Sequence, residues 1–154
     1  MQNTITTFYE AFQNLDAEGM KACYHQDIEF WDPGFGTLKG EDAGAMWTML
    51  CQNAQDFKLE FSNITANEQG GTAHWEAWYT FSRTGRKVHN IIDATFEFKE
   101  GKIIKHTDQF NLHKWARQAL GFQGFLLGGT AFFQKKLQQQ TQQMLQKFKA
   151  KNIV

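Results

Sequence analysis

The spacing of the apolar residues changes once along this chain, and this change limits the folds open to it. Up to residue 54 the apolar residues recur every three or four positions, which is typical of amphipathic helices. From residue 57 to residue 112 they alternate, which is typical of half-buried strands. Helices followed by strands and short turns predict an α+β fold with an antiparallel meander. A chain of 154 residues is long enough for one such core.

Local signals set the bounds of these elements. Asp16 is a good N-cap for a second helix, and Pro33-Gly34 ends the first strand. We expect helices at residues 3–15, 17–25 and 41–54. We expect strands at residues 28–31, 57–64, 72–82, 87–98 and 103–112.

Composition excludes several classes of protein. The 16 basic and 16 acidic residues balance, so a nucleic-acid partner is not expected. No run approaches the ~20 apolar residues of a membrane span, and the N-terminus has no signal-peptide pattern, so we expect a cytoplasmic protein. Cys23, Cys51 and the five histidines show no recognised metal-ligand spacing, so we expect no metal and no cofactor.

The end of the chain forms a separate segment. We expect a domain over residues 1–114 and a helical extension over residues 115–154, in which glycines interrupt an apolar stretch before a Gln- and Lys-rich helix at 131–149. The extension is expected to pack on its own domain or on a dimer partner. A role as a lid or at a membrane surface is the alternative.

Two carboxylates lie inside apolar runs, and they are the first candidates for chemistry. Asp32 follows Phe30-Trp31, and Asp93 follows Ile91-Ile92. Burying a charge in such a run is costly unless the group is paired or protonated. One such carboxylate can act as a general base, and a protonated one can donate to an enolate oxygen. Alternatively, Asp32 accepts backbone hydrogen bonds in a turn, and Asp93 is satisfied by a neighbouring strand or by His89.

The last expected strand adds a second polar cluster. Alternation places His106, Asp108 and Phe110 on one face of it, and His89 and Asp93 on one face of the strand before. If both faces point inward, Asp108 and a histidine form an acid–base pair; the pair can instead join strands structurally. Alternation does not fix the inward face of residues 72–82, and we favour the face that carries Glu76 and Trp78.

Several of these segments resemble a known superfamily. The stretch from Phe8 to Gly34, with Asp16-Ala17-Glu18-Gly19 and Trp31-Asp32-Pro33, is similar to the opening of the ketosteroid isomerases and of the wider SnoaL-like, nuclear-transport-factor-2-like proteins. Ile91 to Phe98 and Glu100 to Ile104 resemble their closing strands. The resemblance covers roughly residues 3–112. It implies a cone-shaped fold, with a curved sheet on three helices around an apolar pocket, often in a homodimer.

The resemblance also implies roles for individual residues. In the isomerases an Asp before Pro is the general base and falls on Asp32, while a protonated Asp falls on Asp93. The position of their oxyanion tyrosine falls on Phe8, with Tyr9 one residue away. The strand aspartate of SnoaL-type polyketide cyclases is closest to Asp108.

The function that follows is a cofactor-free isomerase or cyclase acting on a small apolar carbonyl compound. The alternative is a non-catalytic module that binds a ligand or forms a dimer. Epoxide hydrolysis is disfavoured, because Arg83 and Arg86 belong to a hairpin turn and the expected pocket strands supply no arginine. The candidate catalytic residues are Asp32, Asp93, Asp108 and His106. The candidate substrate contacts are Phe8, Tyr9, Trp47, Trp78, His89 and Phe110.

Overall fold

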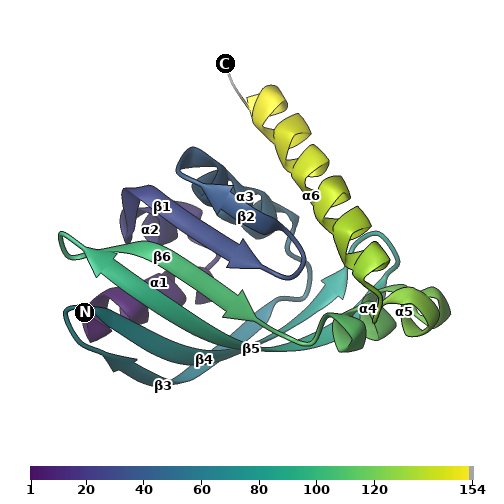
Figure 1. Ribbon diagram of the computed structural model, residues 1–154, viewed down its shortest axis with the longest axis horizontal. Helices are drawn as coiled ribbons and strands as arrows, with labels where there is room; N and C mark the ends of the chain where they lie inside the picture. The colour runs from purple at the N-terminus through teal and green to yellow at the C-terminus, as the bar shows by residue number, and fades with distance from the viewer. Residues whose placement is uncertain (153–154) are drawn as a thin grey trace.

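The computed structural model describes residues 1–152 and shows helices first, then a meander of strands, then a helical tail (Figure 1). The helices are α1 (Gln2–Gln13), α2 (Ala17–Ala22), α3 (Glu41–Asn53), α4 (Leu112–Leu120), α5 (Phe122–Leu127) and α6 (Ala131–Asn152). The strands are β1 (Tyr24–Asp32), β2 (Gly36–Lys39), β3 (Lys58–Ala66), β4 (Gly70–Phe81), β5 (Arg86–Lys99) and β6 (Lys102–Gln109). The predicted α+β class is confirmed.

The six strands form one sheet in the order β2-β1-β6-β5-β4-β3. Four of the five neighbouring pairs are antiparallel, including all pairs of the predicted meander β3 to β6, while β1 and β6 run parallel. A parallel pair needs a long crossover connection, and here α3 and the whole meander lie between the two strands. The segment from Gly36 to Gly40, expected as a loop, contains the short strand β2.

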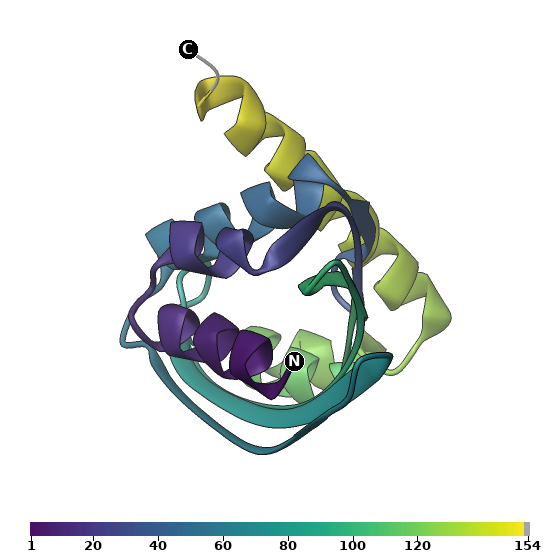
Figure 2. The same cartoon turned by 90° about the vertical axis from the view of Figure 1, so that its left-hand side faces the viewer.

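The sheet curves around α1, so that the core lies on its concave side (Figure 2). Helix α1 buries Ile5, Phe8, Tyr9 and Phe12, which recur at the spacing of one helix face. Trp47 of α3 contacts the rings of Phe8 and Phe12 edge to face. The apolar face of α1, which the helical spacing at the start of the chain predicts, therefore fills the space inside the curved sheet.

The long helix α6 packs on its own chain. Leu145 of α6 is fully buried in the core. Its side chains also donate to the backbone of the turn after β1: Gln138 to the carbonyl of Pro33 at 3.1 Å, and Thr141 to that of Gly34 at 2.9 Å. The extension thus holds the turn that follows Asp32. No helix within residues 1–152 is both long enough and apolar enough to cross a bilayer.

Candidate functional site

A cavity of about 270 Å³ opens between the concave face of the sheet and helices α3, α4 and α6. Its volume is at the small end for ligand pockets, which run from ~300 to 1,000 Å³. Most of its wall is apolar, including Phe12, Trp47, Trp75, Ile92 and Leu137. Two carboxylates, Asp32 and Asp108, line it as well. The cavity can therefore hold a small apolar molecule against two acidic groups.

Asp32 ends β1 and takes part in a tight turn. Its Oδ1 accepts the backbone N–H of Gly34 at 2.9 Å and that of Phe35 at 2.6 Å. The side chain is thus the turn acceptor that the sequence offered as the alternative, and it also lines the cavity. Burial raises the pKa of Asp32 to about 7, even though the N–H of Phe35 lowers it, and the charge of Asp108 raises it further.

The register between β1 and β6 explains why these two carboxylates meet. Phe30 lies opposite His106 and Trp31 opposite Thr107, so the next step along both strands places Asp32 beside Asp108. Phe30 and His106 are fully buried on the inner face. Alternation in two parallel strands therefore carries both carboxylates to one face at one end of the pair.

Asp108 is held by hydrogen bonds from two neighbours. It is 2% exposed, and its Oδ1 accepts from Nε1 of Trp75 at 3.3 Å. The same oxygen lies 2.9 Å from Nε2 of His106. The predicted pairing of His106 with Asp108 is present. Both residues are buried and both belong to β6, so the pair itself does not join two strands.

A buried chain of hydrogen bonds extends behind Asp108 and fixes the proton positions. Nε1–H of Trp47 donates to the hydroxyl oxygen of Tyr24 at 2.8 Å. The hydroxyl hydrogen of Tyr24 is then free for Nδ1 of His106, 2.8 Å away. His106 therefore carries its hydrogen on Nε2 and donates it to Asp108. Every donor in this chain then has one acceptor, so the network is satisfied.

Asp93 does not share this cavity. It lies on the outer face of β5, where its side chain is 80% exposed and lies 2.9 Å from Nδ1 of His74. The inner positions of β5 belong to Val88, Asn90, Ile92, Ala94 and Phe96, so strict alternation turns Asp93 outward. The expectation that Asp93 faces Asp32 across a pocket is therefore wrong. The alternative, a carboxylate satisfied by a neighbouring strand, describes its contacts.

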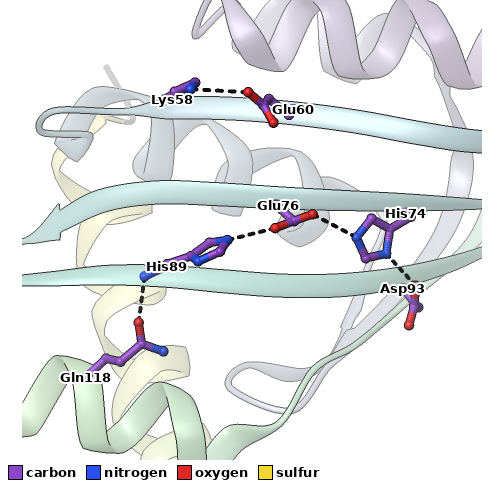
Figure 3. Close-up of polar contacts among 7 residues, drawn as sticks. All are labelled: Lys58, Glu60, His74, Glu76, His89, Asp93 and Gln118. Atoms are coloured by element: carbon purple, nitrogen blue, oxygen red, sulfur yellow. Dashed lines mark hydrogen bonds and ion pairs between the residues drawn. The ribbon is translucent and has the colours of Figure 1, made fainter.

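The other candidates on this face belong to a chain of polar contacts in solvent (Figure 3). Glu76 lies 2.8 Å from Nε2 of His89 and 3.1 Å from Nε2 of His74. Its pKa is lowered by these two hydrogen bonds, and the pKa of His74 is raised, first by its bond to Asp93. Trp78 stacks on His89 with ring centroids 4.4 Å apart. Trp78 and His89 are thus not cavity contacts, because the Glu76–Trp78 face of β4 points outward.

The remaining aromatic candidates divide between core and cavity. Trp47 and Phe110 line the cavity, as expected. Phe8 and Tyr9 are fully buried in the core, and Phe8 stacks on Tyr24. Within residues 1–152 the hydroxyl of Tyr9 is the one buried side-chain polar atom without a partner, and burial raises its pKa well above the usual value.

Two polar residues of the cavity were missed in the sequence. The Tyr79 oxygen accepts Nε1–H of Trp115 at 2.8 Å, which leaves the hydroxyl hydrogen free. Burial raises the pKa of Tyr79 to about 12, so this group stays a donor at neutral pH. Asn90 is 9% exposed and lines the cavity from β5. The signal for Asn90 was available, since it is the single amide in the alternating apolar series of β5.

Across residues 1–152, no three side chains of His, Cys, Asp or Glu converge in a way that would hold a metal ion. The groups that line the cavity instead suit proton transfer: a carboxyl with a pKa near neutrality, a fixed carboxylate, a hydroxyl and an amide.

Comparison with protein families adds to this geometry. The model of the SnoaL-like domain matches residues 5–106, about two thirds of the chain. The chain belongs to the SnoaL-like family. The match spans α1 to most of β6 and includes Asp32, while Asp108 and the tail lie just beyond it. A search of curated proteins found no match.

Solved structures show where the SnoaL-like fold recurs. An LEH-like epoxide hydrolase from M. tuberculosis is 20% identical, with 82% of this chain and 89% of that chain covered and a TM-score of 0.62. A protein with a ketosteroid isomerase-like fold from Catenulispora acidiphila, in complex with trimethylamine, is 11% identical over 75% and 91%, with a TM-score of 0.66. TsrD from Streptomyces laurentii is 17% identical over 79% and 95%, with a TM-score of 0.67. These likenesses establish the fold.

Proposed function

We propose that this SnoaL-like protein is a cofactor-free acid–base enzyme of the isomerase or cyclase type that acts on a small apolar carbonyl compound. One observation carries the proposal: Asp32 and Asp108 line the same apolar cavity. Burial and the charge of Asp108 raise the pKa of Asp32 to about 7. A base with a pKa near the working pH combines availability with proton affinity, which suits general base catalysis.

The proposed step is proton abstraction next to a carbonyl group. The Asp32 carboxylate takes a proton from the adjacent carbon, the C–H electron pair becomes a C=C bond, and the carbonyl π pair moves to oxygen. Asp32 then returns the proton, at the same carbon or at a conjugated one. The hydroxyl of Tyr79 and the amide of Asn90 line the same cavity and are the candidate donors to the enolate oxygen.

Asp108 replaces Asp93 in this scheme and has a different role. We assign it as a negative charge that adds to the effect of burial in raising the pKa of Asp32. Trp75 and His106 donate to its Oδ1 and hold it in one orientation. His106 and Tyr24 act through Asp108 and are positioning residues, because both lie in the core behind it.

Epoxide hydrolysis remains the less favoured chemistry. Arg83 belongs to the turn after β4, as expected, and it lines the cavity from there. Among the ion pairs of residues 1–152, none joins Arg83 to Asp32 or Asp108. The hydrolase neighbour supports the fold and not the reaction.

The experiment is hydrogen–deuterium exchange into simple ketones. Cyclohexanone, acetophenone and a tetralone are incubated with the protein in D₂O, and loss of the proton signal next to the carbonyl is followed by NMR. We expect exchange above buffer that falls by roughly 10²–10⁴ in Asp32→Asn, the usual contribution of a general base. Asp93→Asn is the matched control and should exchange at the wild-type rate, because its carboxyl lies outside the cavity. Equal rates in wild type and Asp32→Asn would show that Asp32 is not the base.

Binding without turnover is the second candidate function. The apolar wall of the cavity supports it equally, since a ligand needs no carboxylate to bind there. Saturation-transfer NMR with the same ketones, together with no exchange in any variant, would favour it. A cytoplasmic location and a homodimer stay predictions from the sequence, and light scattering on the purified protein tests the second.

A further inference from the structure

The tail exposes an unusual number of large apolar side chains. Helix α5 and the start of α6 expose five of them by at least half of their surface. They are Phe122 at 72%, Phe125 at 53%, Leu126 at 58%, Leu127 at 54% and Phe132 at 74%. We call these five residues the α5 patch. A contiguous apolar patch of this kind on a protein surface usually marks an interaction site.

The packing of α5 holds these side chains outward. Gly124 and Gly128 face α4, and a Cβ atom at either position would collide with Ala116. Nε2 of His113 donates to the carbonyl oxygen of Phe125 at 2.8 Å, which ties α5 to α4 a second time. The small residues of α5 are therefore inside and the large apolar ones outside, the reverse of an ordinary surface helix.

Acidic and basic residues are unevenly distributed along the chain, and the change falls just before the tail. All 16 acidic residues lie at or before Asp108, so residues 109–154 carry seven Lys and Arg and no Asp or Glu. The overall balance of charge conceals this asymmetry. The segment that bears the α5 patch is therefore the basic part of the protein.

Exposed basic side chains lie on α4 and α6, the helices on either side of α5 in the chain. Lys114, Arg117, Lys135 and Lys136 are exposed on α4 and on the first turns of α6. None of them forms an ion pair with another residue of the described range 1–152. The Lys136 ammonium lies 5.9 Å from the ring centroid of Phe132, within the patch. Cations without acidic partners, set around exposed aromatic rings, match an anionic apolar surface.

We propose that the α5 patch docks the protein on the surface of an anionic phospholipid bilayer. The apolar side chains would enter the boundary between headgroups and acyl chains, and the basic residues would contact lipid phosphates. Neither contribution is large alone, so stable docking needs both. Docking is independent of the acid–base step and goes beyond the proposed function.

The α5 patch lies near the cavity, so docking would bring the cavity close to the bilayer. Helix α4 supplies Leu112 and Trp115 to the cavity wall, and α5 packs on α4 at the same end of the sheet (Figure 1). A docked protein would hold its cavity one helix away from the lipid. An apolar substrate dissolved in the bilayer would then reach the cavity over a short path.

The test is co-sedimentation of the full chain with vesicles. One set of vesicles contains equal parts of phosphatidylglycerol and phosphatidylcholine, and the other contains phosphatidylcholine alone. We expect binding to the anionic vesicles and partitioning to the neutral ones that is weaker by roughly 10²–10³-fold, because each of the four basic residues near an anionic surface adds ~1 kcal/mol and 1.4 kcal/mol is tenfold. The double variant Phe122→Ser with Phe125→Ser should lose binding to both.

Charge variants measure the contribution of the basic residues separately from that of the apolar side chains. Lys135→Gln with Lys136→Gln should weaken binding to anionic vesicles about tenfold or more, by the same contribution per residue. The matched controls change exposed residues elsewhere: Ile91→Gln, and Lys39→Gln with Lys99→Gln. Both controls should bind as the wild type does.

Two outcomes would overturn the proposal. One is binding to neither kind of vesicle. If light scattering then shows a dimer that the double Phe variant makes monomeric, the patch is an interface between copies. The other is equal loss of binding in the patch and control variants, which shows non-specific adsorption. Ketone exchange by the double Phe variant is measured in parallel, so that a failure of docking is distinguished from a failure of the proposed chemistry.

Discussion

Replacing Asp32 by Asn tests whether its carboxyl is desolvated in the cavity, independently of any substrate. An Asn side chain keeps the oxygen that accepts from Gly34 and Phe35 and removes only the titration. In the folded protein the pKa of Asp32 is raised from 3.8 to about 7. Between these two pH values the folded state binds a proton that the unfolded chain has released. Wild-type stability therefore falls as pH rises through this window, and the variant lacks that fall.

The magnitude follows from the size of the shift. A change from 3.8 to about 7, at 1.36 kcal/mol per pH unit, corresponds to about 4 kcal/mol. Part of the carboxyl surface faces the cavity and is screened by water there, so we expect about 2–4 kcal/mol. The free energy of unfolding of Asp32→Asn minus that of the wild type should rise by this amount from the acid to the alkaline end.

Urea unfolding followed by tryptophan fluorescence, on both sides of the window, measures this difference. Glu68→Gln is the control, because Glu68 is an exposed carboxyl in the turn between β3 and β4 and should leave the wild-type profile unchanged. Parallel pH profiles for Asp32→Asn and the wild type would refute the reasoning. They would mean that Asp32 titrates as it does in water, and the acid–base proposal would lose its main support.

Five further substitutions test the packing around the site by urea unfolding. Tyr24→Phe leaves a buried indole N–H and an imidazole nitrogen without partners and should cost about 2–4 kcal/mol, whereas Tyr9→Phe removes a hydroxyl without a partner and should be neutral or stabilising. Gly124→Ala sets a Cβ atom 1.9 Å from a carbonyl oxygen of α4 and should cost ~1–3 kcal/mol, while Gly44→Ala in α3, which meets only a flexible Lys side chain, should gain up to ~1 kcal/mol. Leu145→Ala removes the buried anchor of α6 and should cost ~2–5 kcal/mol and expose α6 to protease; unchanged stability would show that α6 is not part of the core.

The placement of Asp93 shows how much local sequence can decide. Its strand carries Val88, Ile92, Ala94 and Phe96 at alternate positions, and these residues alone specify which face is buried. The superfamily resemblance assigned an inward carboxylate to Asp93, but the inward side chains next to it are Ile92 and Ala94. Because side chains alternate along a strand, a difference of one residue turns a side chain to the opposite face. Asn90, on the inward face, was identifiable by the same rule.

The turn at Asp32 was predictable from local sequence, whereas a place for Asp32 in a pocket was implied only by the superfamily resemblance. The Asp-Pro-Gly sequence fixes the turn, and the apolar run before it makes the strand. The raised pKa, in contrast, needs the surrounding walls and Asp108, which come from distant parts of the chain.

The sequence alone determined the α+β class, the order of the elements apart from the short strand β2, and which residues of each strand share a face, because helix and strand periods are local properties. Only the tertiary structure decided which carboxylates meet. Asp32 and Asp108 are neighbours because β1 and β6 pair in parallel, with Phe30 opposite His106. That pairing joins two strands that are separated in the sequence by α3 and the strands β3 to β5, and no local pattern in either strand predicts it.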